Sequence, residues 1–474
     1  MNDVARLDAT AQAELVRKKQ IKPSELLEGA IGRIDRLNPE INAVVTKMYD
    51  EAKKSIDAGL PEGPFTGVPF LLKDLSASYA GARQTSGSRF CKDYVSPVDS
   101  VIVQRHKAAG LVICGKTNTP EYGLLPTTEP ELLGAATNPW NTGRSTGGSS
   151  GGAGAAVASG MVPMAHASDG GGSIRIPASC NGVFGVKPTR ARISSGPLVG
   201  DVMNGLTNEH AETRSVRDSA ALLDATRGNA PGDPYVAPEP ERPYLQEVGA
   251  NPGKLRIAFA RQTPLGLPLH PDCIAAVEDA AALCEELGHH VEEAAPSVTG
   301  DQLVQAFTAL WSAGNAWTIK GMAMAMGKEP KEEDFEIMTW AMYQQGLQVS
   351  ASDYLLAISA LQFLSRQIAD WHQGYDVWLT PTLAAPPVEL GWITSTPEEP
   401  MRAFTRAAEW VPYTPIMNVT GQPAMSVPLY WNDEGLPIGA HFAAPYNGEA
   451  ILFRLAAQLE EARPWSGKRP PVSA

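Results

Sequence analysis

Ser173 follows three consecutive glycines, and this arrangement could support nucleophilic catalysis. Gly170, Gly171 and Gly172 leave their backbone N–H groups unobstructed, and such groups can converge on the oxyanion of a tetrahedral intermediate. A serine hydroxyl at the end of that turn would be placed to attack the same carbonyl. A plain glycine-rich turn is the alternative, and the segment by itself does not decide between the two.

Ser149 is a second candidate nucleophile, because residues 147–151 read GGSSG and satisfy the pattern G-x-S-x-G. In α/β-hydrolases this pattern marks a nucleophile elbow, with a strand before the serine and an acid and a histidine further along the chain. Histidines from His166 to His441 follow, so the inventory leaves such a triad open. Residues 144–146 (RST) make a poor strand end, however, and this disfavours the elbow interpretation.

Lys73 is the candidate base. It follows the apolar run 67–72, which predicts a buried strand ending at Lys73 and Asp74. A lysine held in such surroundings loses hydration, which lowers its pKa and makes the neutral amine a usable base. A solvated lysine at a strand end is the ordinary alternative. Lys73 is therefore a stronger candidate for a catalytic base together with the two serines than by itself.

The segments around these three residues resemble the amidase signature family in order, spacing and local sequence. They read GVPFLLKD around Lys73, GRSTGGSSGGAGAAVASG around Ser149 and SDGGGSIRIPASCNGVFGVKPT around Ser173. Further matches, KTNTPEYG, TNPW and NVTGQPAMSVP, extend the resemblance over nearly the whole chain. It implies an α/β fold in one amidase signature domain over residues 1–474, with a large mixed β-sheet covered by helices on both faces.

The resemblance also implies a Ser–cis-Ser–Lys triad. Ser173 matches the nucleophile that carries the acyl group, Lys73 matches the base, and Ser149 matches the bridging serine, whose preceding peptide bond is cis in the family. Backbone N–H groups of four consecutive residues would form the oxyanion hole, namely Gly170, Gly171, Gly172 and Ser173. No metal or organic cofactor has a task in this mechanism, and we expect none.

Three further residues have expected structural roles. Asp169 and Arg175 flank the glycine turn and match residues that support this loop in the family, so we expect an ion pair that serves as scaffold. His441 stands where relatives often have glutamine, and we expect it to be a packing residue outside the chemistry.

Alternating helices and strands are expected around these motifs. A helical pattern at 101–109 precedes an apolar run at 111–115 that predicts a strand. Residues 432–435 (NDEG), between two apolar runs, predict a β-hairpin. The Gly/Ser-rich segment 143–185 has the composition of a flexible linker, but apolar and β-branched residues follow the small ones, so we expect close backbone packing around a site.

A helical region at about 300–375 departs most from the family pattern and is rich in Trp and Met. Such side chains pack in a core more often than in a pocket. The family's substrate channel is built partly from this variable region, so we expect an apolar pocket with Gly123, Trp311 and Asn315 as candidate lining residues. The resemblance therefore implies hydrolysis of small amides through an acyl-enzyme on Ser173, with carbamates (urethanes) and cyclic amides as further candidate substrates.

The composition disfavours other classes of partner. The 474 residues include 52 acidic and 39 basic side chains, a net charge of −13 that disfavours nucleic acid. We see no secretory signal and no run of 18 apolar residues, so we expect a cytoplasmic protein without a membrane partner. Five scattered cysteines predict neither a disulfide framework nor a zinc site. The expected partner is a small-molecule amide or carbamate, and a homodimer is one option for assembly.

Three functions stay open at this point. The first is a stand-alone amidase signature hydrolase, and the second is the glutaminase-type subunit of a transamidation complex, which also belongs to this family. The third is a catalytically silent binding protein, which the presence of Lys73, Ser149 and Ser173 disfavours. Testing the isolated chain on small amides would separate them.

Overall fold

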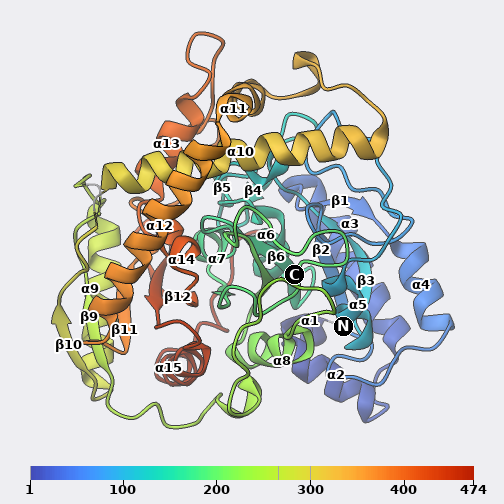
Figure 1. Ribbon diagram of the computed structural model, residues 1–474. Coiled ribbons are helices and arrows are strands. Elements are labelled where there is room, and N and C mark those ends of the chain that lie inside the picture. The colour runs from blue at the N-terminus through green and yellow to red at the C-terminus, as the bar shows by residue number, and fades with distance from the viewer. Residues whose placement is uncertain (1, 265, 299) are drawn as a thin grey trace.

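The computed structural model describes residues 2–264, 266–298 and 300–474 (Figure 1). Its strands are β1 Val44–Lys47, β2 Pro69–Lys73, β3 Val112–Thr117, β4 Thr137–Asn138, β5 Asn141–Ser145, β6 Met164–Asp169, β7 Phe184–Lys187, β8 Asn208–Thr213, β9 Arg256–Phe259, β10 His290–Glu293, β11 Val377–Pro381, β12 Ala424–Trp431 and β13 Pro437–Ala443. All except the β4–β5 pair belong to one eleven-stranded sheet, in the order β1-β3-β2-β6-β8-β7-β12-β13-β11-β9-β10.

This sheet is mixed. Strand β2 runs parallel to both of its neighbours, β3 and β6, and β9 runs parallel to β10 and β11. The remaining neighbouring pairs are antiparallel. In Figure 1 the sheet extends from β1 and β3 at the right, through β6 near the centre, to β9 and β10 at the left. Strands β2 and β6 are parallel neighbours, third and fourth from the β1 edge, so side chains at their carboxyl ends lie at the same edge of the sheet.

Helices cover both faces of the sheet, as predicted. They are α1 Asn2–Arg6, α2 Ala9–Arg17, α3 Pro23–Ile41, α4 Tyr49–Asp57, α5 Val101–Ala108, α6 Gly151–Ala158, α7 Arg175–Asn181, α8 Val216–Thr226, α9 Pro271–Glu286, α10 Gly300–Met326, α11 Ile337–Gln348, α12 Ala351–His372, α13 Arg402–Trp410, α14 Thr414–Thr420 and α15 Glu449–Ala462. Side chains of α5, α8, α9 and α15 share one apolar cluster with the sheet, and those of α3 and α6 share another with the opposite face.

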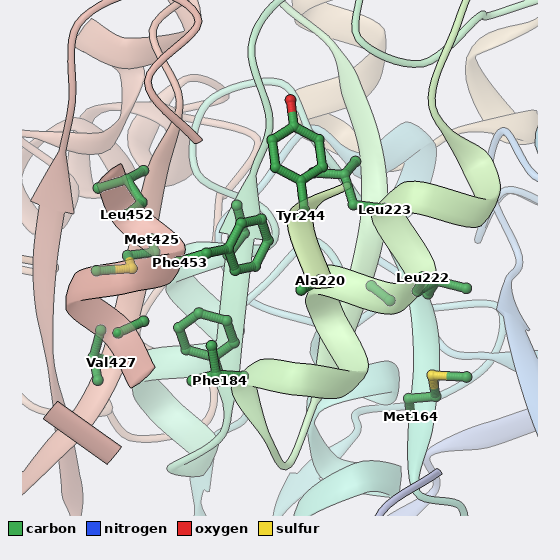
Figure 2. Close-up of a cluster of buried hydrophobic side chains, with 14 of the residues drawn as sticks. Met164, Phe184, Ala220, Leu222, Leu223, Tyr244, Met425, Val427, Leu452 and Phe453 are labelled. Carbon is green, nitrogen blue, oxygen red and sulfur yellow. The ribbon is translucent and has the colours of Figure 1, made fainter. Parts of the chain in front are cut away.

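The alternation of side chains along the strands explains this division. Phe70 and Leu72 of β2 join the cluster of α5 and α8, whereas Leu71 between them joins the cluster of α3 and α6. Figure 2 shows the first cluster, where α8 and α15 pack against β7 and β12. In that view the side chains of Phe184 from β7 and Phe453 from α15 lie in the space between α15 and α8. Both faces of β2 are buried, which accounts for its nearly continuous apolar sequence.

The local predictions hold at several elements. The strand predicted to end at Lys73 is β2, and the helix and strand predicted at 101–115 are α5 and β3. The expected hairpin joins β12 to β13, with the Asn432 N–H donating to the Leu436 carbonyl at 3.0 Å. The Gly/Ser-rich segment 143–185 is no linker, because it contains β6, α6 and α7, and their residues are buried.

The variable region is helical, as expected. Helix α10 lies across the top of Figure 1, and α12 descends from it toward the left. Among the described helices, none by itself has the length and hydropathy of a membrane span, and the pair α11 and α12 meets that test jointly with a bend of 103° between them. Side chains of both helices pack in a third apolar cluster with α10, α13 and α14.

Candidate active site

Lys73 and Ser149 are in direct contact at the carboxyl end of β2. Lys73 is the last residue of β2, and its Nζ lies 2.7 Å from Ser149 Oγ and 3.0 Å from Ser168 Oγ. The Lys73 side chain is fully buried, and these two hydroxyls are the hydrogen-bond partners of its amine among the described residues. The contact brings together two of the three residues that the sequence motifs single out.

The surroundings of Lys73 favour its neutral form. Burial lowers the pKa of Lys73 to about 7, although the negative charges of Glu209, Asp169 and Glu212 act in the opposite direction. The loss of hydration thus outweighs three nearby carboxylates. A neutral amine that contacts a hydroxyl oxygen at 2.7 Å can accept its proton.

Ser149 is held by a compact turn directly before α6. The Gly148–Ser149 peptide bond is cis, as the family resemblance implied. A side chain at Gly148 would meet the Thr127 carbonyl oxygen at 2.7 Å, so this position accepts only glycine without a backbone shift. The strand before the turn, β5, pairs with β4 outside the main sheet, and the elbow of an α/β-hydrolase is therefore not the local structure here.

Ser173 lies at the end of the glycine turn, between β6 and α7. Its side chain reaches two cavities, one of which Ser149 also lines. Among the described residues, no hydrogen bond joins the hydroxyls of Ser149 and Ser173. The structure thus joins Lys73 to Ser149 directly and brings Ser173 to the same cavity.

The glycine turn corrects one expectation about the oxyanion hole. The N–H of Gly172 donates to Asp169 Oδ1 at 2.7 Å and is therefore not available to an oxyanion. This bond forms because the turn folds back over the end of β6, where the Asp169 carboxylate is buried. The N–H groups of Gly170, Gly171 and Ser173 make no hydrogen bond to the described part of the chain. These three groups remain the expected donors to an oxyanion.

A buried ion pair supports the turn from behind. Arg175 Nε and Nη2 both donate to the Asp169 carboxylate at 2.9 Å, and both side chains are fully buried. Burial alone would raise the pKa of Asp169, but the charge and hydrogen bonds of Arg175 bring it well below its usual range. Arg175 also contacts Asn418 at 2.8 Å and His441 Nε2 at 3.0 Å. His441 is thus more than packing, because it belongs to the polar network under the turn.

Two cavities meet at Ser173. The first, of about 100 Å³, is here called the apolar cavity, and its walls come from α10, α13 and the segment 123–126. Its apolar lining includes Leu124, Leu303, Phe307, Phe404, Val411 and Pro415. The second, of about 270 Å³, is called the serine-lined cavity, and its hydroxyls besides those of Ser149 and Ser173 include Ser78, Ser86, Ser100, Ser168, Ser194 and Ser195.

Comparison with known proteins assigns the family. The family model named Amidase matches residues 25–453, which is most of the chain. The chain belongs to the amidase signature family. A 6-aminohexanoate-cyclic-dimer hydrolase from Paenarthrobacter ureafaciens is 42% identical over 477 residues, which span 98% of this chain and 96% of that protein. The chain is therefore a hydrolase of amide carbon–nitrogen bonds.

Solved structures of related enzymes agree in fold. A 6-aminohexanoate cyclic dimer hydrolase superposes with a TM-score of 0.95 at 41% identity, and the match covers 99% of each chain. A bacterial aryl acylamidase of the amidase signature family superposes with a TM-score of 0.87 at 28% identity over 97% of each chain. The expected mixed sheet with helices on both faces is thus the fold of this amidase.

Two of the three expected pocket residues line a cavity, and the third does not. Gly123 and Trp311 line both cavities of the amidase, next to Ser173. Asn315, one helical turn after Trp311, lines neither of these two cavities. Its side chain is fully buried and donates to the Thr339 carbonyl at 3.1 Å, which ties α10 to α11. A shift of four residues along α10 was enough to move this side chain from the cavity side toward the neighbouring helix.

Two residues of the site were not predicted. Ser168 contacts the Lys73 amine, and Glu209 lines the serine-lined cavity. Glu209 Oε2 lies 2.7 Å from His166 Nε2, and His166 Nδ1 accepts the Lys73 backbone N–H at 3.3 Å. The sequence did contain a signal for Glu209, because the segment NEHAET places three titratable side chains in one six-residue strand, β8. Ser168 offered only its position directly before Asp169.

Proposed function

We propose that the chain hydrolyses small amides with an apolar acyl group through an acyl-enzyme on Ser173. In this proposal Ser149 relays protons and Lys73 is the base. The observation that carries it is the 2.7 Å contact between Lys73 Nζ and Ser149 Oγ in a fully buried environment, next to a cavity that Ser173 shares. The buried amine contacts two hydroxyls, and the shorter contact is the one to Ser149.

The proposed reaction has two halves. Neutral Lys73 accepts the proton of Ser149 while Ser149 accepts the proton of Ser173, and Ser173 Oγ attacks the carbonyl carbon. The carbon–nitrogen bond then breaks, and Ser149 returns a proton to the departing nitrogen. Water attacks the Ser173 ester by the same relay and releases the acid. The N–H groups of Gly170, Gly171 and Ser173 are the proposed donors to the oxyanion in both halves.

The cavities support the substrate class. The apolar cavity removes an aliphatic or aromatic acyl group from water, and burial of that surface contributes about 25 cal/mol per Å². Its described lining contains no charged side chain that would favour the ammonium and carboxylate of glutamine. A relative at 42% identity is named for hydrolysis of the cyclic dimer of 6-aminohexanoate, so we include cyclic amides, and carbamates present the same carbonyl–nitrogen bond.

The deciding experiment compares kcat/KM for an anilide, an aryl carbamate, the cyclic dimer of 6-aminohexanoate and glutamine with the purified chain. We expect the first three to be cleaved faster than glutamine. A preference for glutamine would overturn the proposal and favour a glutaminase-type subunit of a transamidation complex. A serine-directed sulfonyl fluoride should also add one mass equivalent at Ser173, and peptide mapping of that label to Ser149 would contradict the assigned nucleophile.

The setting in which this reaction takes place is also proposed. We infer a cytoplasmic enzyme whose partner is a small-molecule substrate, and a homodimer is an assembly that size-exclusion chromatography with light scattering would test. A single species at the mass of one chain, 50.5 kDa, would exclude it.

A further inference from the structure

We propose that Glu209 selects the leaving amine of the substrate, favouring amines with a cationic or N–H-bearing tail over amines with an anionic tail. The inference rests on the proposed roles of Ser173 and Ser149. It goes beyond them because it assigns substrate preference on the amine side of the bond to one side chain.

The first step is to decide which cavity holds the leaving group. Ser149 lines the serine-lined cavity and does not line the apolar cavity, whereas Ser173 lines both. The group that returns a proton to the departing nitrogen must lie beside that nitrogen. The leaving amine therefore occupies the serine-lined cavity, and the acyl group occupies the apolar cavity.

The second step concerns charge in that cavity. Among the described residues, Glu209 is the one lining residue of the serine-lined cavity with an acidic or basic side chain. The remaining lining side chains are apolar, hydroxyl-bearing or amide. A leaving amine in this space thus meets a single carboxylate, which attracts an ammonium and repels a second carboxylate.

The third step is that this carboxylate is held in place. Glu209 Oε2 accepts the Nε2–H of His166 at 2.7 Å, because His166 Nδ1 is occupied by the Lys73 N–H. Glu209 Oε1 makes no hydrogen bond to the described residues, and the side chain keeps 10% of its surface exposed. One oxygen is thus anchored to a fully buried imidazole, and the other is available to a ligand.

The test uses three hexanamides that share an acyl group and differ in the tail of the amine. The amines are 1,2-diaminoethane, propylamine and β-alanine, which give a cationic, a neutral and an anionic tail. The wild-type chain should show the highest kcat/KM for the cationic tail and the lowest for the anionic one. Glu209→Gln keeps the size and the acceptor for His166, and it should reduce the cationic-to-anionic ratio by about tenfold or more, as loss of a charge-assisted hydrogen bond does.

Matched controls separate this role from others. Glu292→Gln removes the same charge from an exposed position on β10 and should leave the ratio unchanged. Equal kcat/KM for the three tails in the wild-type chain, or an unchanged ratio in Glu209→Gln, would overturn the inference. The proposed function fails differently, because then the neutral hexanamide would not be cleaved, or Ser173→Ala would still cleave it.

Discussion

At the scale of single residues, the chemistry depends on how far burial changes Lys73. A lysine in water is protonated near neutrality, since its ordinary pKa is about 10.4. Here burial lowers the pKa of Lys73 to about 7, although the negative charges of Glu209, Asp169 and Glu212 act to raise it. A large fraction of the amine is therefore neutral at pH 7, as the proposed relay requires.

This predicts a definite pH dependence. The neutral form of Lys73 increases about tenfold per pH unit below its pKa and levels off above it. We expect kcat/KM on a neutral amide to rise from pH 5.5 with an apparent pKa near 7 and to level off above about pH 8. Lys73→Ala should lose roughly three decades of rate or more. Lys73→Arg, which keeps the charge, should be as inactive, and a flat wild-type profile from pH 5.5 to 8 would exclude lysine as the base.

The sequence motifs single out three residues that the structure brings to one site, whereas the predicted cavity lining agrees less well, and the reason is physical. Lys73, Ser149 and Ser173 stand in long motifs whose glycines and apolar runs restrict the backbone. Asn315 stands in a regular helix, where the side that faces a cavity depends on how α10 packs on α11 and not on local sequence. The role of Gly172 also depended on a bond to Asp169, which no spacing rule predicts.

At the scale of elements, the turn between β6 and α7 depends on the approach of α14. Thr414, the first residue of α14, donates from Oγ1 to the Gly171 carbonyl at 2.7 Å. A Cβ at Gly172 would lie 2.2 Å from that same Oγ1, and Gly172 has a φ of 133°, which side chains rarely adopt. Glycine is thus required here by both the backbone and its neighbour.

Alanine substitutions at the two adjacent glycines should therefore have different effects on stability. Gly172→Ala should lower the free energy of unfolding by more than about 1 kcal/mol. Gly171→Ala is the matched control, because a Cβ there meets only Phe307 at 3.4 Å and its φ is outside the left-handed region. Urea denaturation followed by tryptophan fluorescence measures both. Equal losses would show that Thr414 does not constrain the turn.

Element predictions succeeded where the sequence pattern is local. The strand ending at Lys73 and the hairpin around Asn432 follow from apolar runs and turn residues. The order of the strands in the sheet could not be predicted from such local patterns, because β12 pairs with β7 across more than two hundred residues of intervening chain. Such pairing depends on which faces can be buried together, and this is a property of the assembled sheet.

At the scale of the molecule, the network around Arg175 connects parts that are distant in the chain. It joins Asp169 of β6 to Asn418 of α14 and His441 of β13. The sheet itself contains strands from Val44 to Ala443, and on this basis we propose that the chain is one domain. A disruption of this network should then weaken the whole molecule and not the turn alone.

Arg175→Met tests this directly, because it leaves the buried Asp169 carboxylate without its partner. Removal of one member of a buried ion pair costs about 3–5 kcal/mol, since the remaining buried charge loses its oppositely charged partner and keeps only hydrogen bonds to neutral groups such as the Gly172 N–H and Asn418. Arg256→Met breaks an exposed pair with Glu292 and should cost less than about 1 kcal/mol, because water already screens that pair. Both variants should be compared by urea denaturation with circular dichroism as the readout. A loss for Arg175→Met no larger than that for Arg256→Met would mean that Asn418 and the surrounding dipoles stabilise Asp169 without the guanidinium.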